Sequence, residues 1–348
     1  MVKKRFLIIC VLLISAALLG QQKKEYHIQT VAFYNLENLF DPEDDPMTFD
    51  NDRTPDGKDH WTYEKYTDKV NRMARVISEI GADITANAPV IIGVAEIENR
   101  KVLEDLTKSK LLINKDYGIV HYDSPDRRGI DVGLLYQKSL FKLKNSSSHK
   151  LILYDNNTSK RIFTRDQLLV SGYLDGDLIH ILVNHWPSRR GGEAKSSYKR
   201  KKAALLNKRI IDSLFAIDPY SKIITMGDLN DNPNSPSVKK VLSAKNSKKD
   251  VKIKELYNPM ALLAKKGIGS IAWRDQWHLF DQMIISASLL QPEYSSYRFY
   301  KTGIYNVPYL MNPNGKYKGY PFRSYANGSY TYGYSDHFPV YLYLIKEK

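Results

Sequence analysis

The sequence has 348 residues, of which 43% are hydrophobic and 26% are charged, and this composition excludes a chain that is disordered throughout. The 52 Lys and Arg residues outnumber the 38 Asp and Glu residues, which gives a formal net charge of +14. Such a positive balance favours polyanionic partners, namely nucleic acid, phosphorylated ligands or anionic membrane surfaces, although it is also compatible with ordinary solubilising charge.

The first 20 residues have the pattern of a secretory signal peptide. Lys3, Lys4 and Arg5 precede an apolar run over 6–19, and small residues lie near the end of that run. A transmembrane helix needs roughly 20 apolar residues, so we expect a cleaved signal and no transmembrane segment in the mature chain. The protein would then be exported, to a periplasm or out of the cell. The only cysteine, Cys10, lies within this run, which excludes disulfides, thiolate zinc sites and cysteine nucleophiles from the mature protein.

Residues 25–348 contain no internal repeat or long linker, and we predict a single domain. Between a first strand at 27–34 and a helix at 66–80 lies an acidic segment, 41–60, whose spacing matches no calcium loop and which we interpret as a solvated insertion. Further helices are predicted at 102–112, 195–215 and 235–242, and further strands at 89–94, 117–122, 131–136, 151–154, 161–170, 178–184, 222–226, 277–286 and 338–345. This order does not match regular βαβ winding and indicates stacked sheets flanked by helices.

Acids, amides and histidines follow these apolar strands repeatedly. They are Asn35 and Glu37, Glu96, Asn184 and His185, Asp228 and Asn230, Asp281, and the final Asp336 and His337. Side chains two residues apart share a face of a strand, so Asn35 with Glu37, and Asp228 with Asn230, are expected to point toward one site. One such pair is more often a turn or a helix cap, but six instances in one chain predict a functional site on a rigid scaffold.

The residue types in this set favour one kind of chemistry. Several carboxylates without cysteine suit a hard cation such as Mg²⁺ or Mn²⁺. Two histidines beside acids suit proton transfer and the stabilisation of a phosphoryl oxyanion. Zinc-dependent hydrolysis is disfavoured, because no closely spaced histidine ligands are present.

In chain order, the motifs Asn35/Glu37, Glu96, Asn184-His185, Gly227-Asp228-Leu229-Asn230, Asp281 and Ser335-Asp336-His337 resemble those of the endonuclease/exonuclease/phosphatase superfamily, over residues 29 to 346. That superfamily includes pancreatic-type deoxyribonucleases, abasic-site endonucleases, sphingomyelinases and inositol-polyphosphate 5-phosphatases. The resemblance implies an α+β fold, a four-layer α/β/β/α sandwich with two mixed sheets packed face to face and helices outside. Two departures from the family pattern are present. The first is that Ala95 precedes the expected metal glutamate where Gln is usual, with Glu98 two residues on, in a structural role rather than as a shared ligand. The second is the unusual stretch that follows Asn184-His185, which contains Trp186, Arg189 and Arg190.

The resemblance also implies roles for the site residues. The divalent cation would be held by Asn35, Glu37, Glu96 and Asp336. Asp228 would orient or deprotonate the attacking water, and Asn230 would position it. His185 and His337 would contact the scissile phosphate, with Asp281 paired to His337 so that its charged form is favoured.

Four further residues are candidates for the substrate side of the site. Asp131 is the candidate acid that supports His185, or else a simple polar residue at a strand entry. Arg128 lies in a loop that resembles a phosphate-contacting loop of the family. Trp186 and Arg189 follow His185 and would stack on a base and contact a phosphate; the alternative is a packed tryptophan with surface arginines.

The substrate is expected to be nucleic acid, DNA or RNA, cleaved by a probable endonuclease without a stable protein partner and acting as a monomer. Basic runs at 195–209 and 245–254 and a Tyr-rich segment at 294–334 favour this choice, although each is also compatible with a solvated surface. The alternatives are a phosphatase or a sphingomyelinase-like phospholipase of the same superfamily, and a non-catalytic binding protein on the same scaffold.

Overall fold

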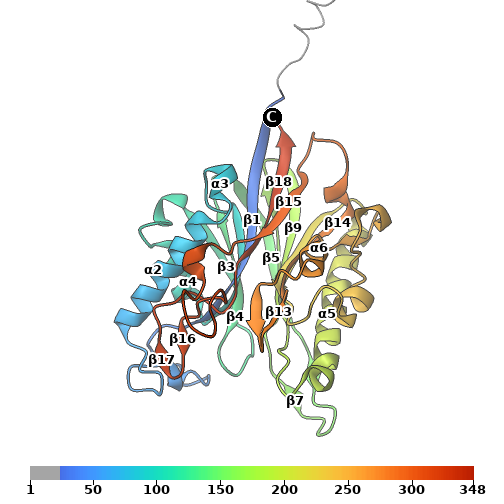
Figure 1. Ribbon diagram of the computed structural model, residues 1–348. Helices are drawn as coiled ribbons and strands as arrows, with labels where there is room; N and C mark the ends of the chain where they lie inside the picture. The colour runs from blue at the N-terminus through green and yellow to red at the C-terminus, as the bar shows by residue number, and fades with distance from the viewer. Residues whose placement is uncertain (1–23) are drawn as a thin grey trace, which may run out of the picture.

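The computed structural model describes residues 24–348, and these form two six-stranded mixed β-sheets packed face to face with helices on both outer sides (Figure 1). The predicted four-layer sandwich is therefore confirmed. Residues 1–20, the predicted signal peptide with Cys10, lie outside the described residues. Among the helices of the described chain, none combines the length and the apolar character needed to cross a membrane.

The first sheet is built around its longest strand, β1. In spatial order its strands are β15 (Arg298–Ile304), β18 (Val340–Glu347), β1 (Tyr26–Leu39), β2 (Ile91–Ile97), β4 (Asp131–Gln137) and β3 (Tyr117–His121). β1 runs parallel to β2 and antiparallel to β18, so the end of β1 and the end of β2 meet the start of β18 at one edge of the sheet.

The second sheet repeats this arrangement. In spatial order its strands are β11 (Leu256–Tyr257), β14 (Asp281–Ser286), β10 (Lys222–Asp228), β9 (Asp177–His185), β8 (Gln167–Leu174) and β5 (Phe141–His149). β9 and β10 are parallel, whereas β14 runs antiparallel to β10. The ends of β9 and β10 therefore meet the start of β14.

Alternation along the strands divides the apolar side chains between two layers. Val31 and Phe33 of β1 face the second sheet, where they join a core that includes Val183 and Met226. Ala32 and Tyr34 face the opposite way, toward the helices α2 (Tyr63–Glu79) and α4 (Arg100–Thr107). The side chains of Thr62 and Asn99 cap the first turns of these helices, as their sequence positions require.

The outer face of the second sheet packs against the long helix α5 (Glu193–Ile217), whose buried face meets Leu182 of β9 and Ile223 of β10. The remaining short elements connect the layers. They are α3 (Ala82–Thr85), α6 (Met260–Lys265), the π-helical turn η3 (Ser237–Val241), η1 (Asn51–Arg53), η2 (Ile113–Lys115), η4 (Lys248–Asp250), η5 (Ala287–Leu290), η6 (Pro308–Leu310), β6 (Leu153–Tyr154), β7 (Arg161–Ile162), β12 (Ile271–Trp273), β13 (Gln276–His278), β16 (Tyr325–Ala326) and β17 (Ser329–Tyr330).

Several element predictions differ from the structure. β15 was not predicted, and the predicted strand at 161–170 is two strands, β7 and β8. β5 was not predicted, because this edge strand pairs only with β8 and is largely polar and exposed, so it carries no apolar alternation. The predicted strand at 277–286 is two strands, β13 and β14, separated by a turn. The predicted helix at 235–242 is only the five-residue turn η3.

The acidic segment 41–60 is anchored rather than simply solvated. Asp41 and Asp50 are buried, and the backbone N–H of Asp41 donates to Oε2 of Glu98 at 2.7 Å. Burial raises the pKa of Glu98 to about 9. Glu98 therefore has a structural role, as expected from the sequence.

Candidate active site

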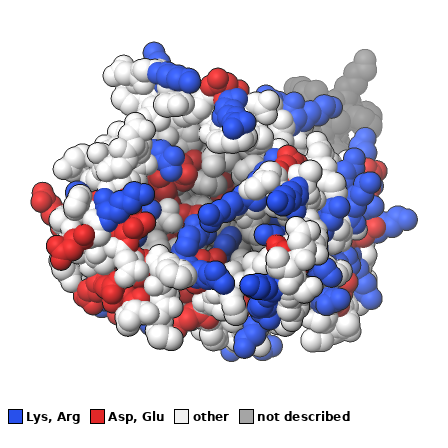
Figure 2. Space-filling view, turned by 90° about the horizontal axis from the view of Figure 1, so that it is seen from below, with Lys and Arg blue, Asp and Glu red and all other residues white. Residues whose placement is uncertain are grey.

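The two sheets bring the polar strand ends together at one edge of the sandwich, at the bottom of Figure 1. Within the second sheet, Asp228 at the end of β10 lies directly opposite His185 of β9 on one side and Asp281 of β14 on the other. Asn35 near the end of β1 crosses to the second sheet, because its Nδ2 donates to Oδ2 of Asp228 at 3.3 Å. Viewed from below, this face is hollowed near its centre, with acidic side chains inside the hollow and Lys and Arg around it (Figure 2).

His337 and Asp281 form a short hydrogen bond at this edge. Nδ1 of His337 lies 2.6 Å from Oδ2 of Asp281, as expected from the sequence, and Ser270 Oγ donates to the same oxygen at 2.5 Å. Burial opposes the charged imidazolium, but the carboxylates of Asp281, Asp228 and Asp336 outweigh burial and hold the pKa of His337 well above its usual range. His337 is therefore a cation that presents Nε2 to the site.

Asp228 occupies the centre of the cluster. Its Oδ2 lies 3.5 Å from Nε2 of His185 and 3.9 Å from Nε2 of His337, and its Oδ1 accepts the backbone N–H of Asn230 at 2.9 Å. Burial raises the pKa of Asp228 to about 7, against the opposing effect of His337. A carboxylate with a pKa near neutrality is suited to accept a proton at physiological pH.

His185 differs electrostatically from His337. Burial, together with the positive charges of Arg165, Arg128 and His337, lowers the pKa of His185 well below its usual range, so this imidazole is neutral. Its Nε2 faces Asp228 and, at 3.7 Å, Oε1 of Glu96, while its buried Nδ1 has no hydrogen-bond partner among the described residues. A neutral His185 with Nε2 protonated can donate to one of these carboxylates or to a substrate oxygen.

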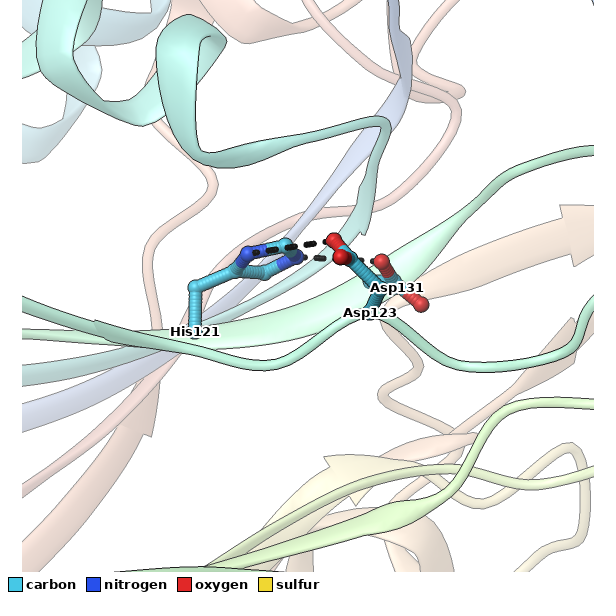
Figure 3. A group of neighbouring side chains, drawn as sticks. All are labelled: His121, Asp123 and Asp131. Atoms are coloured by element: carbon cyan, nitrogen blue, oxygen red, sulfur yellow. Dashed lines mark hydrogen bonds and ion pairs between the residues drawn. The ribbon is translucent and has the colours of Figure 1, made fainter.

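Asp131 does not support His185 as expected. Instead it accepts from Nε2 of His121 at 3.0 Å and from the backbone N–H of Ser124 at 2.9 Å. The exposed carboxylate of Asp123 lies beside that of Asp131, 3.8 Å from Nδ1 of His121 (Figure 3). His121, Asp123 and Asp131 are close enough to hold an ion. However, both oxygens of Asp131 already accept hydrogen bonds from Ser124 and His121, so this group fits an interaction within the fold better than a metal site.

The carboxylates of Glu96 and Asp336 are the most exposed potential metal ligands of the site. The side chain of Glu96 is 15% exposed and that of Asp336 is 31% exposed. Within residues 24–348, the one hydrogen bond that the Glu96 carboxylate accepts comes from the backbone N–H of Asn38, at 3.1 Å. Burial raises the pKa of the neighbouring Glu37, and repulsion from Asp336 adds to this effect. An excess of mutually repelling carboxylates is the donor set that a divalent cation stabilises, so these residues fit Mg²⁺ or Mn²⁺.

Asn35 and Glu37, two of the four predicted metal ligands, are already occupied by protein partners. Oε1 of Glu37 accepts from Arg323 at 3.1 Å, and its Oε2 accepts the backbone N–H of Ser324 at 2.6 Å. Asn35 bonds Asp228 through Nδ2 and the backbone of Glu37 through Oδ1. Both residues therefore fit a role in positioning the acids around the ion better than a role as direct ligands.

The pairs at the strand ends lie in irregular backbone rather than at alternating strand positions: Asn35 and Glu37 at a register shift in β1, and Asp228 and Asn230 where β10 ends. Oδ1 of Asn35 accepts the N–H of Glu37, and Oδ1 of Asp228 accepts the N–H of Asn230, each at 2.9 Å. Glu37, Asn230 and Glu96 all have positive φ angles, of 48°, 49° and 59°, which L-residues rarely adopt. This backbone, and not a shared strand face, directs the side chains, and Nδ2 of Asn230 donates to the carbonyl of Trp186 instead.

Trp186 and Arg189 are not arranged as expected for substrate contacts. Trp186 is 1% exposed and packs in the core beneath α5, so it cannot stack on a base. Arg189 is bonded to Asp231 at 3.1 Å and to the carbonyl of Asn230, and its guanidinium lies over Phe280. By contrast, the side chain of Arg128 is 48% exposed, with its Nε 3.5 Å from Oδ1 of Asp126.

Two basic residues of the site were not predicted from the sequence. Arg323 joins Glu37 to Asp336, at 3.1 and 3.4 Å. Lys69 of α2 is buried beneath them and bonds the carbonyl of Glu37 and, at 2.7 Å, Oγ of Ser324. No local motif surrounds either residue; the only sequence signal is that Lys69 lies on the apolar face of a predicted helix, where a charge needs a buried partner.

The fold and this cluster of acids and histidines define the class of the protein. The sequence profile of the Endonuclease/Exonuclease/phosphatase family matches residues 30–346, nearly the whole chain. The chain belongs to this family, whose members are generally metal-dependent phosphoester hydrolases. No curated protein sequence was found to match it.

Solved structures with the same fold are distant in sequence. A D. rerio TDP2 structure, complexed with single-strand DNA product, is 14% identical with a TM-score of 0.52, and the match covers 91% of this chain and 98% of that one. An endonuclease/exonuclease/phosphatase family protein from Bacteroides thetaiotaomicron is 15% identical with a TM-score of 0.53, covering 92% and 98%. A functionally unknown conserved protein from Enterococcus faecalis is 10% identical with a TM-score of 0.51, covering 91% and 99%.

Proposed function

We propose that this protein is an exported, divalent-metal-dependent phosphodiesterase that cleaves DNA or RNA. The observation that carries the proposal is the convergence on Asp228 of the cationic His337, the neutral His185 and the open carboxylate of Glu96. Metal-dependent hydrolysis of a phosphodiester uses a positively charged group, a proton acceptor and a metal site around one point, and His337, Asp228 and Glu96 provide these.

Each residue of the site has a separate role in the in-line attack by water. Asp228 orients the water and accepts its proton, since its pKa near 7 matches the operating pH. Glu96 and Asp336 would hold the divalent ion, which supplies positive charge to a phosphate oxygen. His337, held in its charged form by Asp281, stabilises the negative charge that develops on the phosphate, and the neutral His185 donates a hydrogen bond to a second oxygen.

Nucleic acid is the proposed substrate for electrostatic reasons. The full sequence carries a net charge of +14, which is +11 without the three basic residues of the predicted signal peptide. Lys and Arg side chains lie around the hollow and are dense on the side of α5 (Figure 2). The side chain of Arg128 is about half exposed, and its charge acts on His185, so it is a candidate to contact a backbone phosphate. The D. rerio TDP2 structure with single-strand DNA product shows that this fold accommodates such a ligand in another protein.

Export is proposed from the sequence alone. The basic segment Lys3–Arg5, followed by an apolar run, has the pattern of a signal peptide. Expression of the full chain in a bacterium and fractionation of the cells would test this, because export predicts a shortened protein outside the cytoplasm.

The substrate class is tested with a panel of phosphate esters. Plasmid DNA, single-stranded DNA, RNA, a phosphoinositide and sphingomyelin are each incubated with the mature protein and Mg²⁺ or Mn²⁺, and then with chelator. We expect metal-dependent cleavage of nucleic acid. Cleavage of the lipid or sugar phosphates alone would instead assign the protein to the phosphatase or phospholipase members of the family.

A further inference from the structure

A pocket of about 490 Å³ adjoins the site, and no step described above uses it. Asp336 and Arg323 lie in its wall, so the pocket opens beside the proposed metal-binding acids. The other wall residues come from two segments, the turn of the β12–β13 hairpin and the loop over 312–331. The pocket therefore extends from the reacting centre toward the surface, where a substrate group next to the scissile phosphate would lie.

Contacts across the pocket hold its two walls together. The hydroxyl of Tyr320 donates to Oδ1 of Asp275 at 2.7 Å, and the rings of Tyr320 and Trp277 meet edge to face at 5.6 Å. On the inner side, Trp277 stacks on Phe338, which is next to His337, at 6.0 Å. Asn312 closes the base of the loop through the carbonyls of Tyr320 and Pro321. These links fix the aromatic side chains relative to the catalytic edge before any ligand binds.

The pocket also presents aromatic rings that the fold does not bury. Trp273 is 60% exposed although Arg274 lies over its ring at 4.3 Å, and Tyr317 is 55% exposed with Lys316 over its ring at 5.6 Å. Exposed aromatic residues that cluster on a surface often mark an interaction site. In proteins that bind single-stranded nucleic acid, aromatic rings stack on the bases and adjacent cations attract the phosphates. Neither Arg274 nor Lys316 pairs with a carboxylate within residues 24–348, so both charges remain available to a phosphate.

We propose that this pocket is a nucleobase subsite, in which Trp273 and Tyr317 stack on an unpaired base while Arg274 and Lys316 contact the flanking phosphates. The inference deepens the proposed function and rests on it, because it assigns the part of the substrate beyond the scissile phosphate. Stacking does not read a base edge, so the subsite selects single-stranded or locally unpaired nucleic acid without strong sequence preference.

The test measures binding without turnover. The mature protein in chelator is titrated into a fluorescently labelled single-stranded octamer and into an abasic octamer with the same phosphates, and anisotropy gives both Kd values. We expect the base-bearing octamer to bind about tenfold more tightly. In Trp273→Ala/Tyr317→Ala this ratio should fall to near one, while the Kd for the abasic octamer changes little.

Two controls keep the result specific. Tyr220→Ala removes a ring that is 64% exposed at the start of β10, at the opposite end from Asp228, and should leave the ratio at the wild-type value. Tyr317→Phe keeps the ring and should also retain the ratio. A wild-type ratio near one, or a ratio that persists in a folded Trp273→Ala/Tyr317→Ala protein, would overturn the inference. A protein that keeps the ratio but cleaves no nucleic acid would contradict the proposed function and leave the subsite standing.

Discussion

Nδ1 of His337 lies 2.6 Å from Oδ2 of Asp281, although 56 residues separate the two in the chain. The pair joins the sheets across the edge that carries the site, since Asp281 begins β14 and His337 lies three residues before the start of β18 at Val340. Because the carboxylate stabilises the imidazolium, His337 keeps a positive charge where a phosphate would develop negative charge.

Asp281→Asn should therefore lower activity without unfolding the protein. The amide keeps the shape of the carboxylate but not its charge, so the pKa of His337 falls and the imidazolium is lost at neutral pH. We expect kcat to fall by about 10²- to 10⁴-fold, with a profile that recovers partly at lower pH. Steady-state rates between about pH 5 and 8 check this, and an unchanged kcat at pH 8 would remove His337 from the proposed mechanism.

Glu96→Gln and Glu98→Gln form a matched pair on the same strand end. Glu96 is the more open carboxylate beside His185, so its loss should raise the Mg²⁺ concentration needed for half-maximal activity by at least about tenfold. Glu98 is buried with a pKa of about 9, so it is protonated at neutral pH and glutamine resembles it. When activity is titrated against Mg²⁺, Glu98→Gln should need nearly the same Mg²⁺ concentration for half-maximal activity as wild type. Equal increases of this concentration in both variants would contradict the proposed position of the ion.

Trp186 should matter for stability and not for substrate stacking. Its ring is 1% exposed beneath α5, and its Nε1 donates to Oδ1 of Asn184 at 3.2 Å. Trp186→Ala is expected to lower the free energy of unfolding by about 3–5 kcal/mol, because it leaves a large cavity. Urea unfolding measures the change. A variant as stable as wild type but weaker in binding nucleic acid would restore the stacking role expected from the sequence.

Without metal, the site should destabilise the protein as the pH rises. Burial raises the pKa of Asp228 to about 7, whereas in the unfolded chain an aspartate titrates near 4. Between these two pKa values the folded state binds a proton that the unfolded state has released. The contribution of Asp228 to the free energy of unfolding is therefore full below about pH 4 and is lost as the pH rises through about 7.

Calorimetry in chelator at about pH 5 and pH 8 measures this loss, with Asp228→Asn as the comparison. The Tm of wild type should fall more between the two pH values than the Tm of the variant, and Mg²⁺ should recover part of the difference at pH 8. Parallel pH dependences would show that Asp228 is not the group responsible.

The sequence predicted those parts of the site that depend on local pattern. Six apolar strands are followed by polar residues, and their periodicity indicated stacked sheets. The four-layer sandwich and the cluster of Asp228, Asp281 and His337 followed from the resemblance that the order of these motifs carries. The roles of Lys69 and Arg323 depend on which distant segments meet, which no local spacing encodes. Asp131 was assigned the wrong histidine for the same reason, because His121 on the neighbouring β3 lies nearer than His185.

Burial was the other source of error. Trp186 follows a site histidine, and sequence alone does not distinguish an exposed ring from one under α5. The paired motifs Asn35-x-Glu37 and Asp228-x-Asn230 were interpreted as strand faces, whereas asparagine and aspartate side chains accept hydrogen bonds from the backbone two residues on and form turns. The residues were therefore predicted, but not the backbone that directs them.

Hydrolysis of bis(p-nitrophenyl) phosphate tests the central claim most directly, because this small diester needs the reacting centre and no extended substrate site. The account predicts that wild type hydrolyses it with Mg²⁺ or Mn²⁺, that chelator abolishes the reaction, and that Asp228→Asn loses at least about 100-fold in kcat. Asp123→Asn, an exposed acid of the His121 group, should keep the full rate. Hydrolysis that survives chelator or survives Asp228→Asn in the purified protein would contradict the account.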